Sequence, residues 1–177
     1  MKQFLAVSAY LALALIIKAQ SFTPLDENSS VKFKIRNFGF TVTGSFKGLK
    51  GTIGFDPNEP EKSAFDVTVD AGSINTGIDM RDEHLRSESY FDVKNYPRIH
   101  FVSTRVTRSN REGTLFVFGN LTIKNITKEI SFPFTARPRN EGYAFSGEFR
   151  INRKDFDVGG SGTISNELLV NLEVIAK

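Results

Sequence analysis

The 177-residue sequence contains no cysteine and no tryptophan, and it has only two histidines, His84 and His100. Without cysteine, the chain forms no disulfide bond, no thiolate metal site and no cysteine-linked lipid anchor. Two histidines are too few for the metal clusters that histidine and cysteine form together. The acidic residues show no spacing typical of a carboxylate-only site. We therefore expect no metal ion, no cofactor and no catalytic centre.

Neither sign of charge dominates, since 23 Lys and Arg stand against 20 Asp and Glu. Two of the basic residues, Lys2 and Lys18, lie in the first 19 positions, and without them the net charge falls from +3 to near +1. Nucleic-acid binding requires Lys and Arg clustered on one face. We expect no nucleic-acid partner.

Only one apolar run is long, and it lies at the start of the sequence. Lys2 is followed by an apolar segment over residues 4–17 and by Ala19–Gln20, a possible cleavage site. A basic start, a short apolar run and a small residue are typical of a secretory signal peptide, and the run is short for a transmembrane helix. Residues 1–19 are therefore predicted to be removed, which leaves a soluble periplasmic or secreted protein without a stable membrane anchor.

Phenylalanine is abundant, with 17 in the sequence, and only Phe4 lies in the predicted leader. About eight segments place apolar residues at alternate positions; in residues 29–35, for example, they alternate with Lys and Ser. Such alternation predicts strands with one buried face. Short polar turns between the segments favour antiparallel pairing, and closure removes the exposed edges. We predict an all-β fold, an eight-stranded antiparallel barrel, as one domain over residues 20–177.

One segment, residues 76–101, does not alternate and concentrates charged side chains. Asp79 stands where it can cap a helix, with Asp82 three residues later in the capping-box position. Asp82 and Arg86 are spaced to form a pair on one helix face. We predict one short helix within residues 79–89.

The same segment carries the motifs of a known family. From Thr76 to Thr104, the order T-G, R-D-x-H-L-x-S, F-D-V and Y-P-x-I-x-F-x-S-T resembles the YceI-like family of secreted, lipocalin-like lipid-binding proteins. A second block, residues 119–130 (GNLTIKNITKEI), is similar to that family's G-x-L-T-I-K-G-x-T-K segment. The colinear match covers about residues 29–175. Asn28 stands where related sequences carry a histidine, so no role of that histidine is transferred.

The resemblance implies an elongated lipocalin-like barrel whose tunnel holds a polyisoprenoid or an isoprenoid quinone, for sequestration or transport. A prenyl chain has no hydrogen-bonding groups along its length, so apolar side chains alone can bind it. Pockets use only part of a core, so we expect about half of the candidate residues to serve packing. The candidates, taken from the alternating apolar faces, are Phe33, Ile35, Phe46, Phe65, Val67, Phe101, Val117, Leu121, Phe132, Phe145 and Phe149.

Arg81, Asp82 and His84 match the family motif residue by residue. We expect them to hold the loop at the mouth of the barrel, with contact to a ligand head group as the alternative. His84 could also pair with Asp82 or Glu88 as a catalytic dyad, which would suggest an enzyme acting on an apolar substrate. Nucleophilic catalysis needs a positioned nucleophile as well, and the sequence shows none, so we expect a binding protein.

The segment over residues 115–123 is apolar on both faces, because Phe116 and Phe118 lie opposite the inward side chains. We expect the helix after Thr76, or its loop, to cover this outer pair. If the pair were exposed, it would support a different function, that of a solid-core barrel acting as an interaction or stress-response module. A homodimer is also possible.

Overall fold

The computed structural model describes residues 20–160 and 162–177. The predicted signal peptide, residues 1–19, lies outside these described residues. No helix in the described part of the chain has the length and apolar character needed to span a bilayer. The strands are β1 (Gln20–Phe22), β2 (Ser30–Asn37), β3 (Phe40–Phe55), β4 (Ala64–Asn75), β5 (Arg98–Arg108), β6 (Leu115–Ile123), β7 (Ile126–Arg139), β8 (Gly142–Asn152) and β9 (Ile164–Ala176). The helices are α1 (Asp79–Arg86) and the short 3₁₀ turns η1 (Asp26–Asn28), η2 (Pro60–Lys62) and η3 (Arg153–Phe156).

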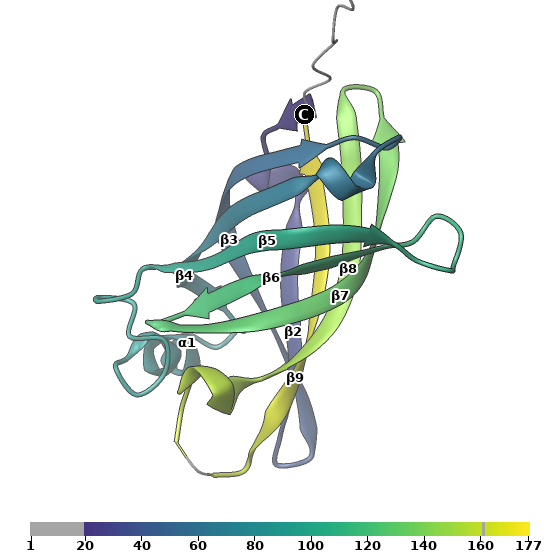
Figure 1. The fold of residues 1–177 in the computed structure, drawn as a ribbon. Helices are drawn as coiled ribbons and strands as arrows, with labels where there is room; N and C mark the ends of the chain where they lie inside the picture. Colours follow the sequence, from purple (N-terminus) through teal and green to yellow (C-terminus); the bar gives the residue numbers. More distant parts are fainter. Residues whose placement is uncertain (1–19, 161) are drawn as a thin grey trace, which may run out of the picture.

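Strands β2 to β9 close into an antiparallel barrel, in the order β3-β2-β9-β8-β7-β6-β5-β4, with β4 pairing back onto β3 (Figure 1). The predicted eight-stranded antiparallel barrel is confirmed. Closure gives every barrel strand two neighbours, so no long edge is left with unpaired backbone groups. β1 is an additional short strand that pairs with the end of β3.

The register of β2 shows how alternation places the apolar side chains inside. Phe33 lies opposite Gly44 on β3 and opposite Val170 on β9. The lysines on either side of Phe33 are exposed, whereas Phe33 itself is partly buried. A slip of one residue would turn the whole apolar face of β2 towards solvent, so burial specifies this register.

One end of the barrel is filled by aromatic side chains, which we call the aromatic plug. The ring centroids of Phe55 and Phe145 lie 5.3 Å apart, and those of Phe65 and Phe145 lie 5.6 Å apart, both edge to face. Phe22 of β1 is only 4% exposed and packs edge to face on Tyr143 at 5.3 Å. Burial of each ring contributes roughly 1.5–3 kcal/mol, and the edge-to-face geometry adds to it. The plug therefore closes this end.

The predicted short helix is present as α1, but its first turn differs from the prediction. Asp79 is the first helical residue, and the capping position is occupied by Ile78, which provides no side-chain hydrogen bond. The carboxylate of Asp82 instead accepts a hydrogen bond from the backbone N–H of Thr76, at 2.9 Å. The helix ends at Arg86, earlier than predicted. Contacts with the end of β4, rather than a capping box, thus fix where α1 begins.

The prediction that α1 covers the outward side chains of Phe116 and Phe118 is wrong, because α1 packs against β4. Arg105 on β5 lies over the ring of Phe118 instead, with Cζ 4.1 Å from the ring centroid. The two residues are cross-strand partners, so strand pairing itself brings the guanidinium to the aromatic face. Such a cation–π contact covers the ring without a separate element.

Asp26 in η1 fastens the N-terminal segment to β3. Its carboxylate accepts hydrogen bonds from the backbone N–H groups of Leu49, at 2.8 Å, and Gly48, at 3.0 Å. Burial acts to raise the pKa of Asp26. These hydrogen bonds and the nearby Lys47 and Arg98 outweigh burial, so the pKa of Asp26 lies below its ordinary value.

The ionised form of Asp26 is therefore expected to stabilise the folded state. Because its pKa is lower in the folded than in the unfolded chain, the contribution is present above about pH 4, the unfolded value, and is lost as the pH falls through the folded pKa. Asp26→Asn should lower the free energy of unfolding by about 1–3 kcal/mol at pH 7, and by less towards pH 2. Urea unfolding across this pH range measures the difference, with the exposed neighbour substitution Glu27→Gln as control. A loss that is independent of pH would contradict the assignment.

Candidate functional site

A cavity of about 230 Å³ runs inside the barrel beside the aromatic plug. On β9 its lining extends from Ile164 to Val174, which corresponds to about 30 Å along an extended strand. A volume of this size spread over such a length describes a narrow tube rather than a round chamber. We call it the tube.

The tube also explains why many inward side chains are only partly buried. Val31, Phe33 and Ile35 on β2 and Val170 and Leu172 on β9 face inwards, border the tube and are all partly accessible. In a filled barrel such side chains would be as buried as Phe55 and Phe145 of the plug, which are 3% and 6% exposed. Their accessible surface faces the internal space, so the barrel is solid at one end and hollow along the rest.

Glycines in the wall keep the phenyl rings from filling this space. A Cβ atom built on Gly44 would lie 2.3 Å from the ring of Phe33, and one built on Gly119 would lie 2.6 Å from the ring of Phe101. Each ring therefore occupies the place of the side chain that the glycine lacks, against the backbone of the neighbouring strand. Both rings border the tube, and both leave it open because the wall beneath them has no side chain.

Phe132 marks the boundary between the plug and the tube. It packs in the plug cluster on one side and borders the tube on the other. Its ring lies 3.2 Å from a Cβ built on Gly147, a looser version of the same arrangement. It also stacks on Phe149, with centroids 4.3 Å apart and planes at 17°. This stacked pair forms part of the floor of the tube.

The structure separates the predicted ligand-binding residues into two groups. The three that do not border the tube pack in the aromatic plug, because their inward positions lie at the closed end of the barrel. For all of the candidates, contact with a ligand stays a prediction. Those that border the tube are Phe33, Ile35, Phe46, Val67, Phe101, Leu121, Phe132 and Phe149. Those that pack in the plug are Phe65, Val117 and Phe145.

Sequence reasoning missed the contribution of β9 to the site. Leu168, Val170, Leu172 and Val174 border the tube, yet none was a candidate. Their alternation is visible in the sequence and matches that of the other strands. The omission came from giving weight to phenylalanine, whereas the wall of the tube is largely aliphatic.

Charged side chains fix α1 at the mouth of the tube. Arg81 borders the tube and donates hydrogen bonds to the hydroxyl oxygen of Thr76, at 2.7 Å, and to its carbonyl oxygen, at 2.8 Å. Asp82, only 3% exposed, accepts hydrogen bonds from the N–H and the hydroxyl of Thr76. Arg86 donates to two main-chain carbonyl oxygens of β4, at 2.8 and 3.0 Å. All three side chains thus hold the helix to the end of β4, and a role of Arg81 towards a head group stays a prediction.

His84 does not form the dyad considered from the sequence. It is exposed, and its ring packs edge to face on Tyr90, with centroids 4.9 Å apart. In the described part of the chain it makes no hydrogen bond with Asp82 or Glu88, and Asp82 is engaged by Thr76. No group of three or more His, Cys, Asp or Glu side chains among the described residues is arranged to hold a metal ion.

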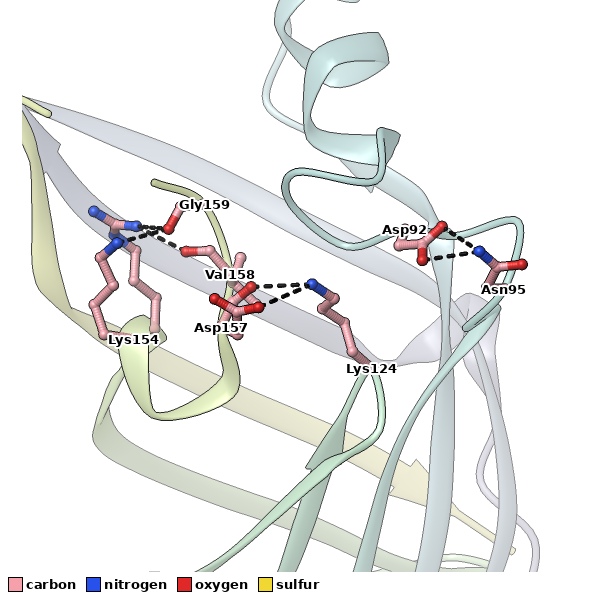
Figure 2. Close-up of polar contacts among 8 residues, drawn as sticks. Asp92, Asn95, Lys124, Lys154, Asp157, Val158 and Gly159 are labelled. Atoms are coloured by element: carbon pink, nitrogen blue, oxygen red, sulfur yellow. Dashed lines mark hydrogen bonds and ion pairs between the residues drawn. The ribbon is translucent and has the colours of Figure 1, made fainter. Parts of the chain in front are cut away.

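The loop between η3 and β9 is fixed at the same end of the barrel. Arg153, only 6% exposed, borders the tube and donates hydrogen bonds to main-chain carbonyl oxygens within residues 158–165. Figure 2 shows Lys124, from the turn between β6 and β7, reaching Asp157, whose carboxylate lies 3.7 Å from its Nζ atom. A buried arginine surrounded by carbonyl oxygens has no sequence signal of its own, and it was not predicted.

A closed antiparallel barrel that is plugged at one end and encloses a narrow apolar tube belongs to the class of lipocalin-like barrels. Comparison with known proteins identifies the family within this class. The YceI-like domain matches residues 22–176. A UPF0312 protein of Pseudomonas savastanoi pv. phaseolicola is 36% identical over 149 residues, which covers 80% of this chain and 77% of the relative. This chain belongs to the YceI-like family, as its two motif blocks indicated.

Solved structures share the fold. The crystal structure of BcnA from Burkholderia cenocepacia superposes with a TM-score of 0.82 at 24% identity, covering 87% of this chain and 99% of that one. A polyisoprenoid binding domain from Saccharophagus degradans, implicated in plant cell wall breakdown, superposes with a TM-score of 0.69 at 15% identity, covering 88% and 97%. At these identities the likeness is one of fold.

The close contact between the ring of Phe33 and Gly44 predicts that substitutions at these two positions are energetically coupled. Gly44→Ala should destabilise the protein by about 1–3 kcal/mol, because the added methyl group overlaps the ring of Phe33. In the background of Phe33→Ala the same change should cost much less, which gives a coupling energy of about 1–2 kcal/mol. Urea unfolding of the four proteins measures it. The control is Thr43→Ala, on the outer face next to Gly44, whose effect on the free energy of unfolding should add to that of Phe33→Ala. If the effects of Gly44→Ala and Phe33→Ala were also additive, the contact between the ring and the glycine would be contradicted.

Proposed function

We propose that this protein binds the hydrocarbon chain of a polyisoprenoid or an isoprenoid quinone in the tube, and thereby sequesters or transports that lipid. The observation that carries the proposal is the tube itself, which is narrow, long and bordered mainly by apolar side chains from all of the long strands. The polyisoprenoid binding domain of Saccharophagus degradans, which has the same fold, supports the choice of ligand class.

The affinity of such a site would come from burial. A prenyl chain offers only C–H groups along its length, and the Phe, Leu, Ile and Val side chains of the tube require no hydrogen bond from it. Burial of about 300 Å² of apolar ligand surface contributes on the order of 7 kcal/mol, before the cost of immobilising the chain. A polar head group could not enter without losing its water. The head would therefore stay at the mouth, where Thr76 and Arg81 border the tube.

The two other functions considered from the sequence are less well supported. A solid-core interaction module is disfavoured by the tube, and the outer Phe118 is covered by Arg105. An enzyme with His84 as base is disfavoured because Asp82 binds Thr76 and because, among the described residues, Glu88 forms no hydrogen bond with His84. Whether two copies form a homodimer stays a prediction.

We place this function outside the cytoplasm, in the periplasm or beyond it, after removal of residues 1–19. The basic start, apolar run and small residue of the leader support that location. Mass spectrometry of the protein purified from its native host should then give a mature chain that begins at Gln20 or within a few residues of it. A chain that retains the whole leader in the soluble cytoplasmic fraction would contradict the proposed location.

Identification of a copurified lipid is the main test of the proposed function. Organic extraction of protein purified from its native host, followed by mass spectrometry, should yield a prenyl compound in near-stoichiometric amount. Gly44→Val should abolish this copurification, because the added side chain forces the ring of Phe33 into the tube. Thr43→Val, the matched change on the outer face of the same strand, should retain it. A protein that is isolated empty and binds no prenyl chain in titration would overturn the proposal.

A further inference from the structure

The hairpin formed by β2 and β3 ends in two exposed phenylalanines. Phe38 is 72% exposed and Phe40 is 77% exposed. On the β3 side the tip projects beyond the barrel wall, because β3 pairs with β4 only from Ser45, opposite Asn75, onwards. On the β2 side the backbone stays attached to the start of β9, since Asn37 pairs with Ile164 and the N–H of Phe38 donates to the carbonyl oxygen of Thr163. In Figure 1 the hairpin extends past the end of the barrel. Two aromatic side chains are therefore presented to solvent on a projecting tip.

The backbone of the tip makes Phe38 an unusual choice. Phe38 and Gly39 form the two-residue turn, with Asn37 paired to Phe40, and their φ angles are +49° and +81°. A turn with two positive φ angles favours Asn, Asp or Gly. A bulky residue there is strained, and at this exposure Phe38 gains little from packing within the folded chain. Strain retained at an exposed aromatic residue is a sign of function.

The same hairpin carries an unbalanced positive charge. Residues 28–55 contain five basic residues and no acidic one, although residues 20–177 as a whole carry a net charge of only about +1. Lys32, Lys34 and Arg36 are exposed on the outer face of β2, and in the described part of the chain none of them forms an ion pair. Exposed aromatic side chains next to uncompensated basic ones match the chemistry of an anionic bilayer surface, which offers apolar depth below a layer of phosphates.

We propose that the tip of the β2–β3 hairpin docks the mouth of the barrel on anionic lipid bilayers. Phe38 and Phe40 enter the interface, and the basic side chains of β2 lie near the lipid phosphates. Asn37 and Val42, which flank the tip, border the tube. A lipid chain can therefore pass between bilayer and tube without crossing bulk water. This transfer step rests on the proposed function, whereas the docking itself does not.

The start of α1 provides a matched comparison at the same mouth. Ile78 and Met80 are 53% and 84% exposed, but Asp79 lies between them and Glu83 follows, both exposed. Acidic neighbours oppose contact with anionic lipids. The guanidinium of Arg81, which follows Met80, is engaged by Thr76. An apolar side chain at Met80 is therefore a control for exposure without a net positive charge beside it.

The absence of tryptophan from the sequence allows a direct test with a single fluorophore. Phe38→Trp and, as control, Met80→Trp are each mixed with vesicles of phosphatidylcholine alone and of phosphatidylcholine with phosphatidylglycerol. Emission of the Phe38→Trp protein should shift to shorter wavelength with the anionic vesicles, and the shift should weaken at high salt. The Met80→Trp protein should shift much less.

Cosedimentation with the same vesicles tests the side chains themselves. Phe38→Asn combined with Phe40→Ser should weaken binding by at least tenfold, while the melting temperature stays equal or rises because the strain at Phe38 is relieved. Replacing Lys34 and Arg36, the basic residues of β2 nearest the tip, by Gln should weaken binding about fivefold per charge. Far-UV circular dichroism confirms that each variant is folded.

No shift and no cosedimentation with anionic vesicles would overturn the proposal, as would an equal shift for Met80→Trp. A dimer in analytical ultracentrifugation that is lost with Phe38→Asn and Phe40→Ser would instead assign the tip to a second copy of the chain. A protein that docks on vesicles but carries no prenyl chain would leave docking intact and overturn the proposed function, so the two failures are distinguishable.

Discussion

The structure depends on where phenyl rings lie relative to glycines in the barrel wall. The barrel is rich in phenylalanine, and at one end Phe55, Phe65 and Phe145 fill its interior by packing edge to face. Elsewhere Phe33 and Phe101 lie against Gly44 and Gly119. The missing side chains accommodate the rings in the wall, and a continuous apolar space remains between the strands.

This arrangement joins the stability of the barrel to its proposed function. The plug provides a close-packed core that anchors β1 and the chain's C-terminal strand, so the rest of the interior need not be filled. The polar contacts of Arg81, Asp82 and Arg153 are concentrated at the opposite end, where they fix α1 and the loop before β9. The two ends are thus held in place by packing and by hydrogen bonds, and between them lies the apolar space that the proposed ligand would fill.

Much of the fold follows from the sequence, because alternation and turn spacing specify strands, and closure is the simplest way to satisfy their edges. The motif blocks identified the family, the first from the stretch that contains α1 and the second from the turn between β6 and β7. Position along the barrel axis could not be read in this way: Phe65 and Phe145 have the same alternation as Phe33, yet they lie in the plug. The contacts between phenyl rings and wall glycines could not be predicted either, because the pairing of Phe33 with Gly44 depends on cross-strand register.

A crystal structure determined under xenon pressure would test the central claim, that the tube is a real and accessible apolar space, most directly. Xenon enters apolar cavities and does not bind where side chains interdigitate. We expect several xenon sites in a row along β9, beside the rings of Phe33 and Phe101, and none among the rings of the plug. Rings of Phe33 and Phe101 that cross the barrel axis and leave no xenon site between them would contradict the account.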